Sequence, residues 1–490
     1  MPETKKSIRE ERIELIRQLQ AEGIQPYPDR FERSHRLVQA LNLPVGDKNV
    51  RLAGRIIAIR KMGKLSFMHI QDAEAKMQLC FAQDDLGQET YAFFKKNIDI
   101  GDFIGAEGEI FVTKTGEQTL RAKSFQLLSK ALLTLPEKWH GLADLEVRYR
   151  QRYLDLIVNE DSRRRFRTRR EVIRAIRRTL EDNNFIEVET PILQAKPSGA
   201  MAKPFLTHHH ALDIDLYMRI APETYLKRLI VGGYDRVFEF AHCFRNEGIS
   251  TAHLQEFLML EYYAAYWNYQ DNMDFTERLL TSTLEKVLGS LTFEYLGKMI
   301  DFSPPWPRKS FRDVILEGVG IDIDEHKTKK ELLDAIHGKG ITLEDINVGA
   351  LGWGALIDAL YKKTCRPQIL SPLFLTSHPK ELSPLARAND ADPSITDRFQ
   401  LVVAGMEIVN AYSELVDPID QRQRLAAQQS LRDAGDEEAM ELDEDYVQCM
   451  EYGMPPISGW GMGIDRFVAL ITNEENIKNT VYFPLMRPLG

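Results

Sequence analysis

The stretch that decides the fold is Val237-Phe-Glu-Phe-Ala-His-Cys-Phe-Arg-Asn-Glu247, with its return Glu256-Phe-Leu-Met-Leu-Glu-Tyr-Tyr263. Aromatic and apolar residues on both sides of a charged loop predict two neighbouring strands. Alternation along the second strand puts a phenyl ring, a thioether, a carboxylate and a phenol on one face. Because a carboxylate is seldom buried unpaired, we expect a pocket floor, where the ring stacks on a base and the acid holds a cationic group. The alternative is an exposed sheet face. The four side chains are Phe257, Met259, Glu261 and Tyr263.

A second polar strand face follows in Glu407-Ile-Val-Asn-Ala-Tyr-Ser-Glu414, where Asn410, Tyr412 and Glu414 share a side. Two sheet faces that each carry acids and an aromatic ring suggest a ligand that is partly cationic. The third segment is Gly459-Trp-Gly-Met-Gly-Ile-Asp-Arg466, which we interpret as a glycine-rich loop opening a helix. Backbone amides at a helix start and an arginine favour anions. It is neither a Walker loop nor a Rossmann fingerprint, and alone it is explained better by tight helix packing.

Outward from these strands, the spacing predicts a helix over about 163–183, further strands at 217–220 and 399–404, and a mainly helical region over about 270–365. Long antiparallel strands with segregated helices predict an α+β fold, an antiparallel sheet flanked by helices. Residues 163–178 hold nine arginines against one glutamate. We favour a solvated helix face for this run over phosphate contact, since apolar residues supply a buried stripe at helical spacing.

The N-terminal part has a different period. Five short strand candidates with one helix candidate after the third fit a five-stranded OB-fold β-barrel. Such barrels bind single-stranded nucleic acid by stacking bases on aromatic rings, for which Phe67 and Phe81 are candidates, although composition alone favours Phe67 as core. The strand candidates are 51–60, 65–71, 77–82, 102–113 and 118–122, and the helix is 89–96. The predicted organisation is an N-terminal helical extension over 1–48, the barrel over 49–134, a linker over 135–162 and the α+β domain over 163–490.

Composition excludes several classes of protein. The chain has 490 residues, 43 % hydrophobic and 28 % charged, with a net charge of −10, which is not that of a disordered, collagen-like or disulfide-scaffold protein. Four cysteines lie far apart without a CxxC pair, and the consecutive His208, His209 and His210 lack convergent spacing, so we expect no zinc. No stretch approaches the roughly 18 apolar residues of a membrane helix. We therefore expect a cytoplasmic protein that does not act at a membrane.

These segments occur in a recognisable order. Phe244-Arg245-Asn246-Glu247, the return strand and Gly461-x-Gly463-x-x-Arg466 follow Thr190-Pro191, which itself follows a helix. They resemble motifs 1, 2 and 3 of the class II aminoacyl-tRNA synthetases. With an OB-fold in front, the chain resembles the aspartyl, asparaginyl and lysyl subgroup, and from about residue 50 onward it is most similar to the lysyl-tRNA synthetase family. The stretches that carry the likeness are GRIIAIRKMGKLSF, YRQRYLDLI, KPFLTHHHALDIDLYMRIAPETYLKRLIVGG, FRNEGIS, NAYSELVDP and GWGMGIDR.

The resemblance implies a two-step reaction. Lysine and ATP give lysyl-adenylate and pyrophosphate, and lysine then passes to the 3′-terminal adenosine of tRNA-Lys. It further implies Mg²⁺ and a homodimer formed through the motif 1 helix and strand. In this reading Arg245 bridges the α-phosphate and the lysine carboxylate, Arg466 lies over the adenine, and Glu407 holds magnesium. These three are the implied catalytic residues.

The family's other positions carry over residue by residue. Acids in the amino-acid pocket disfavour an aspartate-specific enzyme, and the match to anticodon-reading positions reverses the expectation that Phe67 is core. The implied ATP-binding residues are Arg245, Glu247, His253, Phe257, Met259, Glu407 and Arg466. The implied lysine-binding residues are Gly199, Glu223, Arg245, Glu261, Tyr263, Asn410, Tyr412, Glu414 and Gly463. The implied anticodon-binding residues are Arg60, Phe67, Gln78 and Glu117.

Two departures from the family pattern leave alternatives open. A second metal-binding glutamate is replaced by Gln400, whose amide oxygen supplies less charge for magnesium. The motif 2 loop lacks an arginine and a proline and instead holds Ala252, Leu254 and Gln255. A lysine- or RNA-binding paralogue without productive catalysis, and a ligase for another amino acid, are the alternatives.

Overall fold

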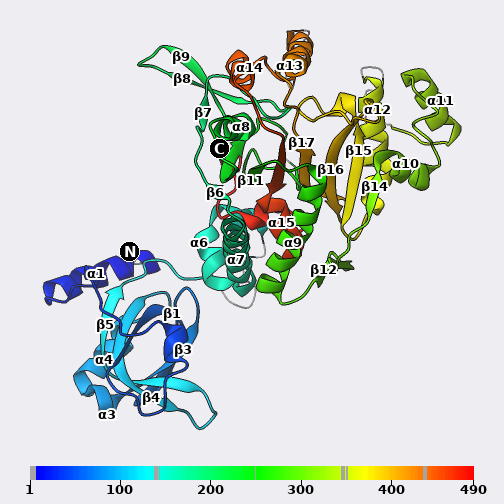
Figure 1. Cartoon of the computed structure of the whole chain (residues 1–490). Coiled ribbons are helices and arrows are strands. Elements are labelled where there is room, and N and C mark those ends of the chain that lie inside the picture. The colour runs from blue at the N-terminus through cyan, green and yellow to red at the C-terminus, as the bar shows by residue number, and fades with distance from the viewer. Residues whose placement is uncertain are drawn as a thin grey trace, which may run out of the picture. The chain divides into compact units, whose positions relative to one another are not determined.

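The computed structural model describes residues 7–136, 142, 144–248, 250–343, 348, 351–433 and 439–489. The chain forms two compact units, Met1–Leu142 and Ala143–Gly490, which are coloured blue to cyan and cyan to red in Figure 1. The division falls inside the segment predicted as a linker. None of the helices in the described ranges combines the length and the apolar content that crossing a membrane requires.

The first unit contains a closed barrel of five strands in the order β1-β2-β3-β5-β4. Alternate side chains point inward, and Met68 and Ile70 lie in the barrel core while the neighbouring Phe67 is only half-buried. The predicted five-stranded OB-fold is confirmed. Phe81 is fully buried and packs against Phe94, so it cannot stack on a base as its composition suggested. The elements are β1 (Val50–Met62), β2 (Leu65–Gln71), β3 (Lys76–Ala82), α3 (Gln83–Leu86), α4 (Gln88–Asn97), β4 (Phe103–Val112) and β5 (Gln118–Ser129).

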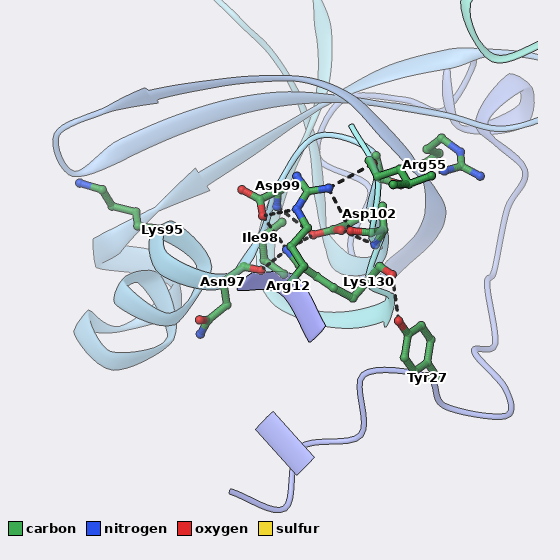
Figure 2. Close-up of polar contacts among 12 residues, drawn as sticks. Arg12, Tyr27, Arg55, Lys95, Asn97, Ile98, Asp99, Asp102 and Lys130 are labelled. Carbon is green, nitrogen blue, oxygen red and sulfur yellow. Dashed lines mark hydrogen bonds and ion pairs between the residues drawn. The ribbon is translucent and has the colours of Figure 1, made fainter. Parts of the chain in front are cut away.

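The N-terminal extension is attached to this barrel through the end of β5. It contains α1 (Ile8–Ala21) and α2 (Leu37–Ala40). Figure 2 shows the buried Lys130, whose Nζ donates to Asp99 Oδ2 at 2.7 Å and to Asp102 Oδ2 at 2.9 Å. Arg12 donates to Ala131 O at 3.0 Å and Tyr27 Oη to Lys130 O at 3.0 Å. The pairing of Lys130 with two carboxylates offsets the cost of burying its charge. The backbone carbonyls of Lys130 and Ala131 anchor the extension through Tyr27 and Arg12.

The second unit is built on an eight-stranded sheet in the order β14-β15-β16-β17-β18-β11-β10-β6. The neighbours from β15 to β10 are antiparallel, as predicted, whereas the short edge strands β14 and β6 pair in parallel. The strands are β6 (Ile186–Glu187), β10 (Arg236–Phe244), β11 (Glu256–Ala265), β14 (Arg308–Ser310), β15 (Leu373–Pro379), β16 (Ile395–Val403), β17 (Met406–Ser413) and β18 (Ile457–Gly463).

Three helices cover one face of this sheet: α7 (Glu160–Asp182), α9 (Tyr269–Leu288) and α15 (Ile464–Ile471). Apolar residues of these helices, such as Val172 and Phe467, form one core with the alternate strand residues Leu258, Leu260 and Tyr262. Because successive side chains on a strand point to opposite faces, the intervening residues of β11 lie on the other face. That face is where the polar residues of the sequence analysis are found.

The remaining elements surround this sheet. The region predicted as mainly helical also contains the hairpin β12 (Thr292–Tyr295) and β13 (Lys298–Asp301), which the sequence analysis missed. A small sheet of β7 (Leu193–Gln194), β9 (Ile214–Met218) and β8 (Phe205–His209) projects near α8 (Glu223–Val231). The other helices are α10 (Phe311–Val319), α11 (Lys329–Gly338), α12 (Trp353–Leu360), α13 (Pro418–Asp433) and α14 (Glu444–Glu451).

The predicted linker over 135–162 is partly wrong. Residues 137–141 and 143 lie outside the described residues, but α5 (Leu145–Arg150) and α6 (Arg152–Val158) occupy most of the rest. Asp144 caps α5, and Arg152 pairs with Asp155 at 2.7 Å where both are fully buried. The charges of Arg152 and Asp155 therefore form an ion pair inside the protein.

The arginine-rich run lies on α7. Eight of its nine arginines form ion pairs with acids within this unit, for example Arg177 with Glu187 at 2.8 Å. The expected solvated face holds for exposed residues such as Arg164, whereas Arg165 and Arg169 are largely buried in their ion pairs.

Candidate active site

The open face of the large sheet carries a cavity of about 330 Å³. This is the size of a small-molecule site. The middle strands β17, β18 and β11 are in register, with Asn410 and Glu261 both opposite Gly461. All four side chains of the predicted pocket floor, Phe257, Met259, Glu261 and Tyr263, line the cavity. An exposed sheet face, the alternative, is not what the structure shows.

The cavity brings together most of the residues predicted for ATP and lysine. Those on its wall are Gly199, Glu223, Arg245, Glu247, His253, Phe257, Met259, Glu261, Tyr263, Glu407, Asn410, Tyr412, Gly463 and Arg466. Two predicted residues lie directly behind the wall. Glu414 is buried beside Lys227, and Gln400 donates from Nε2 to Glu407 Oε2 at 2.6 Å.

One end of the cavity is acidic. Glu223, in the first turn of α8, accepts hydrogen bonds from Tyr412 Oη at 2.8 Å and Lys227 Nζ at 2.5 Å. Glu261 accepts from Tyr263 Oη at 3.2 Å. Burial, and then the charge of Glu223, raise the pKa of Glu261 to about 8. Burial also raises the pKa of the Glu414 carboxyl well above its ordinary value. This end is built to receive a cationic group, which these crowded carboxyls would bind by giving up protons.

The glycines of residues 459–463 open this end of the cavity. The sequence analysis predicted a loop here, but the segment forms β18, a strand inside the sheet. A Cβ atom at Gly459 would overlap Glu414 Oε1 and the ring of Tyr263. Gly459 is therefore needed because side chains of the neighbouring strands cross above it, whereas a Cβ at Gly461 or Gly463 would make only ordinary contacts. The helix α15 begins only at the end of this strand.

The other end of the cavity is basic. The Arg245 guanidinium lies 5.1 Å from the centre of the Phe257 ring, and Arg466 donates to Glu407 O at 3.3 Å. Burial and the neighbouring charge of Arg466 lower the pKa of His253, whose Nδ1 lies 2.8 Å from Ser250 Oγ. Two arginines beside a flat ring fit a phosphorylated, aromatic ligand.

The residues beside Glu407 fit one divalent cation held jointly with a ligand. Glu407 supplies a carboxylate, and the Gln400 side chain lies beside it, with its amide nitrogen donating to Glu407 Oε2. Across the described part of the chain, no group of three or more His, Cys, Asp or Glu residues is arranged to hold a metal. Mg²⁺ is commonly bound by one or two protein oxygens together with substrate phosphates, which is what this pair allows.

Three contributors were missed from the sequence. Lys227 bridges two of the acids, and Arg398 donates to Asn410 Oδ1 at 2.9 Å, which fixes the amide on the cavity wall. Asp465 accepts from the backbone N–H of Leu258 at 2.8 Å and pairs with an arginine of α7, so it ties the start of α15 to β11. Only Lys227 left a signal, since it stands four residues after Glu223, a spacing that brings two side chains together on a helix such as α8.

The anticodon candidates form a second cluster, on the barrel. Gln78 Nε2 donates to Glu117 Oε2 at 2.6 Å, and His69 Nε2 lies 2.8 Å from Glu117 Oε1. Phe67 is on the same side of β2 as His69 and pairs in register with Arg60 of β1. A half-buried ring beside donors and acceptors that are already in position is the arrangement that stacks on and reads unpaired bases.

Both units of the chain match known protein families. Residues 144–487 match the model of tRNA synthetases class II (D, K and N), and residues 50–128 match that of the OB-fold nucleic acid binding domain. Similar proteins include the lysine–tRNA ligase of Pelotomaculum thermopropionicum, 48 % identical over 97 % of this chain and 94 % of that protein. Those of Carboxydothermus hydrogenoformans and Thermosipho africanus are 47 % and 46 % identical over 97 % and 99 % of this chain, and over 97 % of each relative. The chain belongs to the lysine–tRNA ligase family of class II tRNA synthetases.

Proposed function

We propose that the cavity activates L-lysine with ATP, and that the chain transfers the activated lysine to tRNA-Lys. One observation carries this proposal: a single cavity has buried carboxylates at one end and two arginines with a stacking ring at the other. An amino acid with two ammonium groups fits the acidic end, and the phosphates of a nucleotide fit the basic end. The amino-acid carboxylate and the α-phosphate then meet between them.

Lysine is held by its two ammonium groups. The side-chain ammonium lies at Glu223 and Glu414, with Tyr412 and Tyr263 closing the sides. Glu261 interacts with the charges of both Glu223 and Arg245, and therefore lies between the two ends. It holds the α-ammonium, which leaves the carboxylate facing Arg245. Gly199, Asn410 and Gly463 complete the wall of this subsite.

ATP occupies the basic end. The adenine stacks on Phe257 beside Met259 and Glu247, Arg466 lies over it, and His253 contacts the outer phosphates. Mg²⁺, held by Glu407 and assisted by Gln400, supplies positive charge to the departing pyrophosphate. Arg245 offsets the repulsion between the two anions that must approach each other.

The reaction needs no covalent enzyme intermediate. A carboxylate oxygen of lysine attacks the α-phosphorus as the bond to pyrophosphate breaks, which gives lysyl-adenylate. A hydroxyl of the 3′-terminal adenosine of tRNA then attacks the lysyl carbonyl, and AMP leaves. Rate acceleration comes from positioning and from charges fixed in advance.

The barrel reads the anticodon through Arg60, Phe67, Gln78 and Glu117. The second unit forms a homodimer through α7 and β6, the edge strand of the sheet. Exposed apolar side chains on β6 and the small sheet, Ile186, Leu193 and Leu206, support a protein-covered surface there. We place the enzyme in the cytoplasm, where translation takes place.

Charging of tRNA-Lys with radiolabelled lysine tests the proposal. We expect lysine to be attached to tRNA-Lys in an ATP-dependent reaction and no other amino acid of a standard panel to compete. Binding of lysine without charging would favour the binding paralogue, which the hydrogen bond between Gln400 and Glu407 motivates.

A further inference from the structure

Lys227 lies beneath the acidic end of the cavity and carries a charge that the reaction scheme does not use. Its side chain is fully buried, and its Nζ is 2.5 Å from both Glu223 Oε1 and Glu414 Oε2. The rings of Tyr263, Tyr412 and Tyr446 surround it, with centres 5.8, 5.8 and 5.9 Å away. Burial alone would lower the pKa of Lys227, but the two carboxylates outweigh it and raise the pKa well above its usual value. The ammonium is therefore always charged.

Lys227 leaves one oxygen of Glu414 available. Glu414 binds Lys227 through Oε2, while its Oε1 is fully buried and has no hydrogen-bond partner among the described residues. That free oxygen points toward Gly459, which lines the cavity and has no side chain to block it. A buried, unpaired carboxylate oxygen is costly unless something binds it. Lys227 thus holds one oxygen of Glu414 in place and presents the other to a ligand.

Lys227 also sets the net charge of the pocket. Three buried acids surround this end of the cavity: Glu223 and Glu261 on its wall, and Glu414 directly behind it. Lys227 is ion-paired with Glu223 and Glu414, and its charge also acts on Glu261. When all three acids are ionised they carry three negative charges, and Lys227 reduces the net charge to minus two. Lysine brings two ammonium groups, while its carboxylate pairs with Arg245. With Lys227 present, the filled pocket is neutral; without it, one buried acid would remain unpaired or protonated.

We propose that Lys227 is a specificity-determining positioning residue, which orients Glu223 and Glu414 and matches the net charge of the pocket to an amino acid with two ammonium groups. This inference rests on the proposed activation of lysine. A purely structural (i, i+4) pair on α8 is the competing explanation. It would account for the contact with Glu223 but not for the second contact with Glu414, which follows the end of β17.

Lys227→Ala tests the proposal in ATP–pyrophosphate exchange. We expect the KM for lysine to rise by about tenfold or more while the KM for ATP stays within about threefold, because an unpaired buried acid is costly and the basic end is untouched. The alanine leaves space for a three-carbon ammonium. n-Propylammonium should therefore lower the lysine KM of the variant, whereas n-propanol, similar in shape but uncharged, should not. The same additives on the wild type show whether either competes with lysine.

Two further variants keep the test decisive. Lys130→Met removes the buried lysine of the barrel and should reduce stability without changing the lysine KM. If Lys227→Ala does not fold, Lys227→Met and Lys227→Met/Glu414→Gln replace it. The double variant restores the net charge of minus two, so calorimetry should show that it binds lysine more tightly than Lys227→Met alone.

Equal rises in both KM values, rescue by propanol as well as propylammonium, or a double variant weaker than the single one would overturn the role of Lys227. Absence of lysine-dependent exchange in the wild type would instead overturn the proposed function.

Discussion

Binding of lysine should release a proton from Glu261. The carboxyl is buried on the cavity wall, and its pKa is raised to about 8 by burial and then by Glu223. At pH 7, below this value, most of the empty sites carry the proton. An ammonium group placed beside the carboxylate favours the ionised form and lowers the pKa. We therefore expect protons to be released when lysine binds at pH 7, and fewer to be released at pH 9.

The same coupling makes affinity depend on pH. Because the empty site binds the proton more tightly than the filled site, raising the pH toward 8 strengthens lysine binding. The proton must leave before lysine binds, so the Kd for lysine should fall as the pH rises from 6 toward 8 and change less above pH 8.

Isothermal titration calorimetry of lysine in two buffers with different ionisation enthalpies measures the released proton directly. Glu261→Gln should reduce the release and weaken the pH dependence, and the protons that remain would come from the other buried carboxyl, Glu414. Glu256→Gln, which changes an exposed acid on the same strand, should preserve both. Tight binding without proton release at pH 7, or a Kd that is constant between pH 6 and pH 8, would refute this account of Glu261.

Three other predictions concern the two ends of the cavity and the barrel. Glu414→Gln should raise the lysine KM by about tenfold while the ATP KM changes little, as measured by pyrophosphate exchange, and equal effects would remove Glu414 from the lysine pocket. Phe67→Ala should weaken tRNA charging, since stacking on a base is worth about 1–3 kcal/mol, but leave adenylate formation intact; loss of both would indicate a folding defect. Gln400→Glu replaces the amide that bonds Glu407 with a second carboxylate, so half-maximal exchange should need several-fold less Mg²⁺, and an unchanged magnesium midpoint would place Gln400 outside the metal site.

The features that depend on the alternation of residues along one strand could be predicted from the sequence. Alternation along 256–263 placed four side chains on one face, and the structure puts all of them on the cavity wall. The barrel was predicted from the same kind of pattern, which β2 shows by alternating buried and half-buried residues, although β5 is longer than the predicted 118–122. The strand β18 was predicted as a loop, since three glycines favour a turn unless neighbouring strands need the space above them.

What depends on tertiary contact could not be predicted. Lys227 was visible only as the fourth residue after Glu223, and its second partner, Glu414, comes from a distant strand. Arg152 and Asp155 were assigned to a linker. Their burial could not be predicted, because it results from the packing of α6 against the C-terminal segment. Phe81 is an aromatic residue that could stack on a base, but its position in β3 directs its side chain into the barrel core.

Lysine-dependent ATP–pyrophosphate exchange on the wild-type chain, measured across the standard amino acids, tests the central claim most directly. The account predicts robust magnesium-dependent exchange with lysine and little with ornithine, arginine or uncharged amino acids, because two ammonium groups must meet the acids while the carboxylate reaches Arg245. Faster exchange with another amino acid, or lysine binding without exchange at any magnesium concentration, would contradict it.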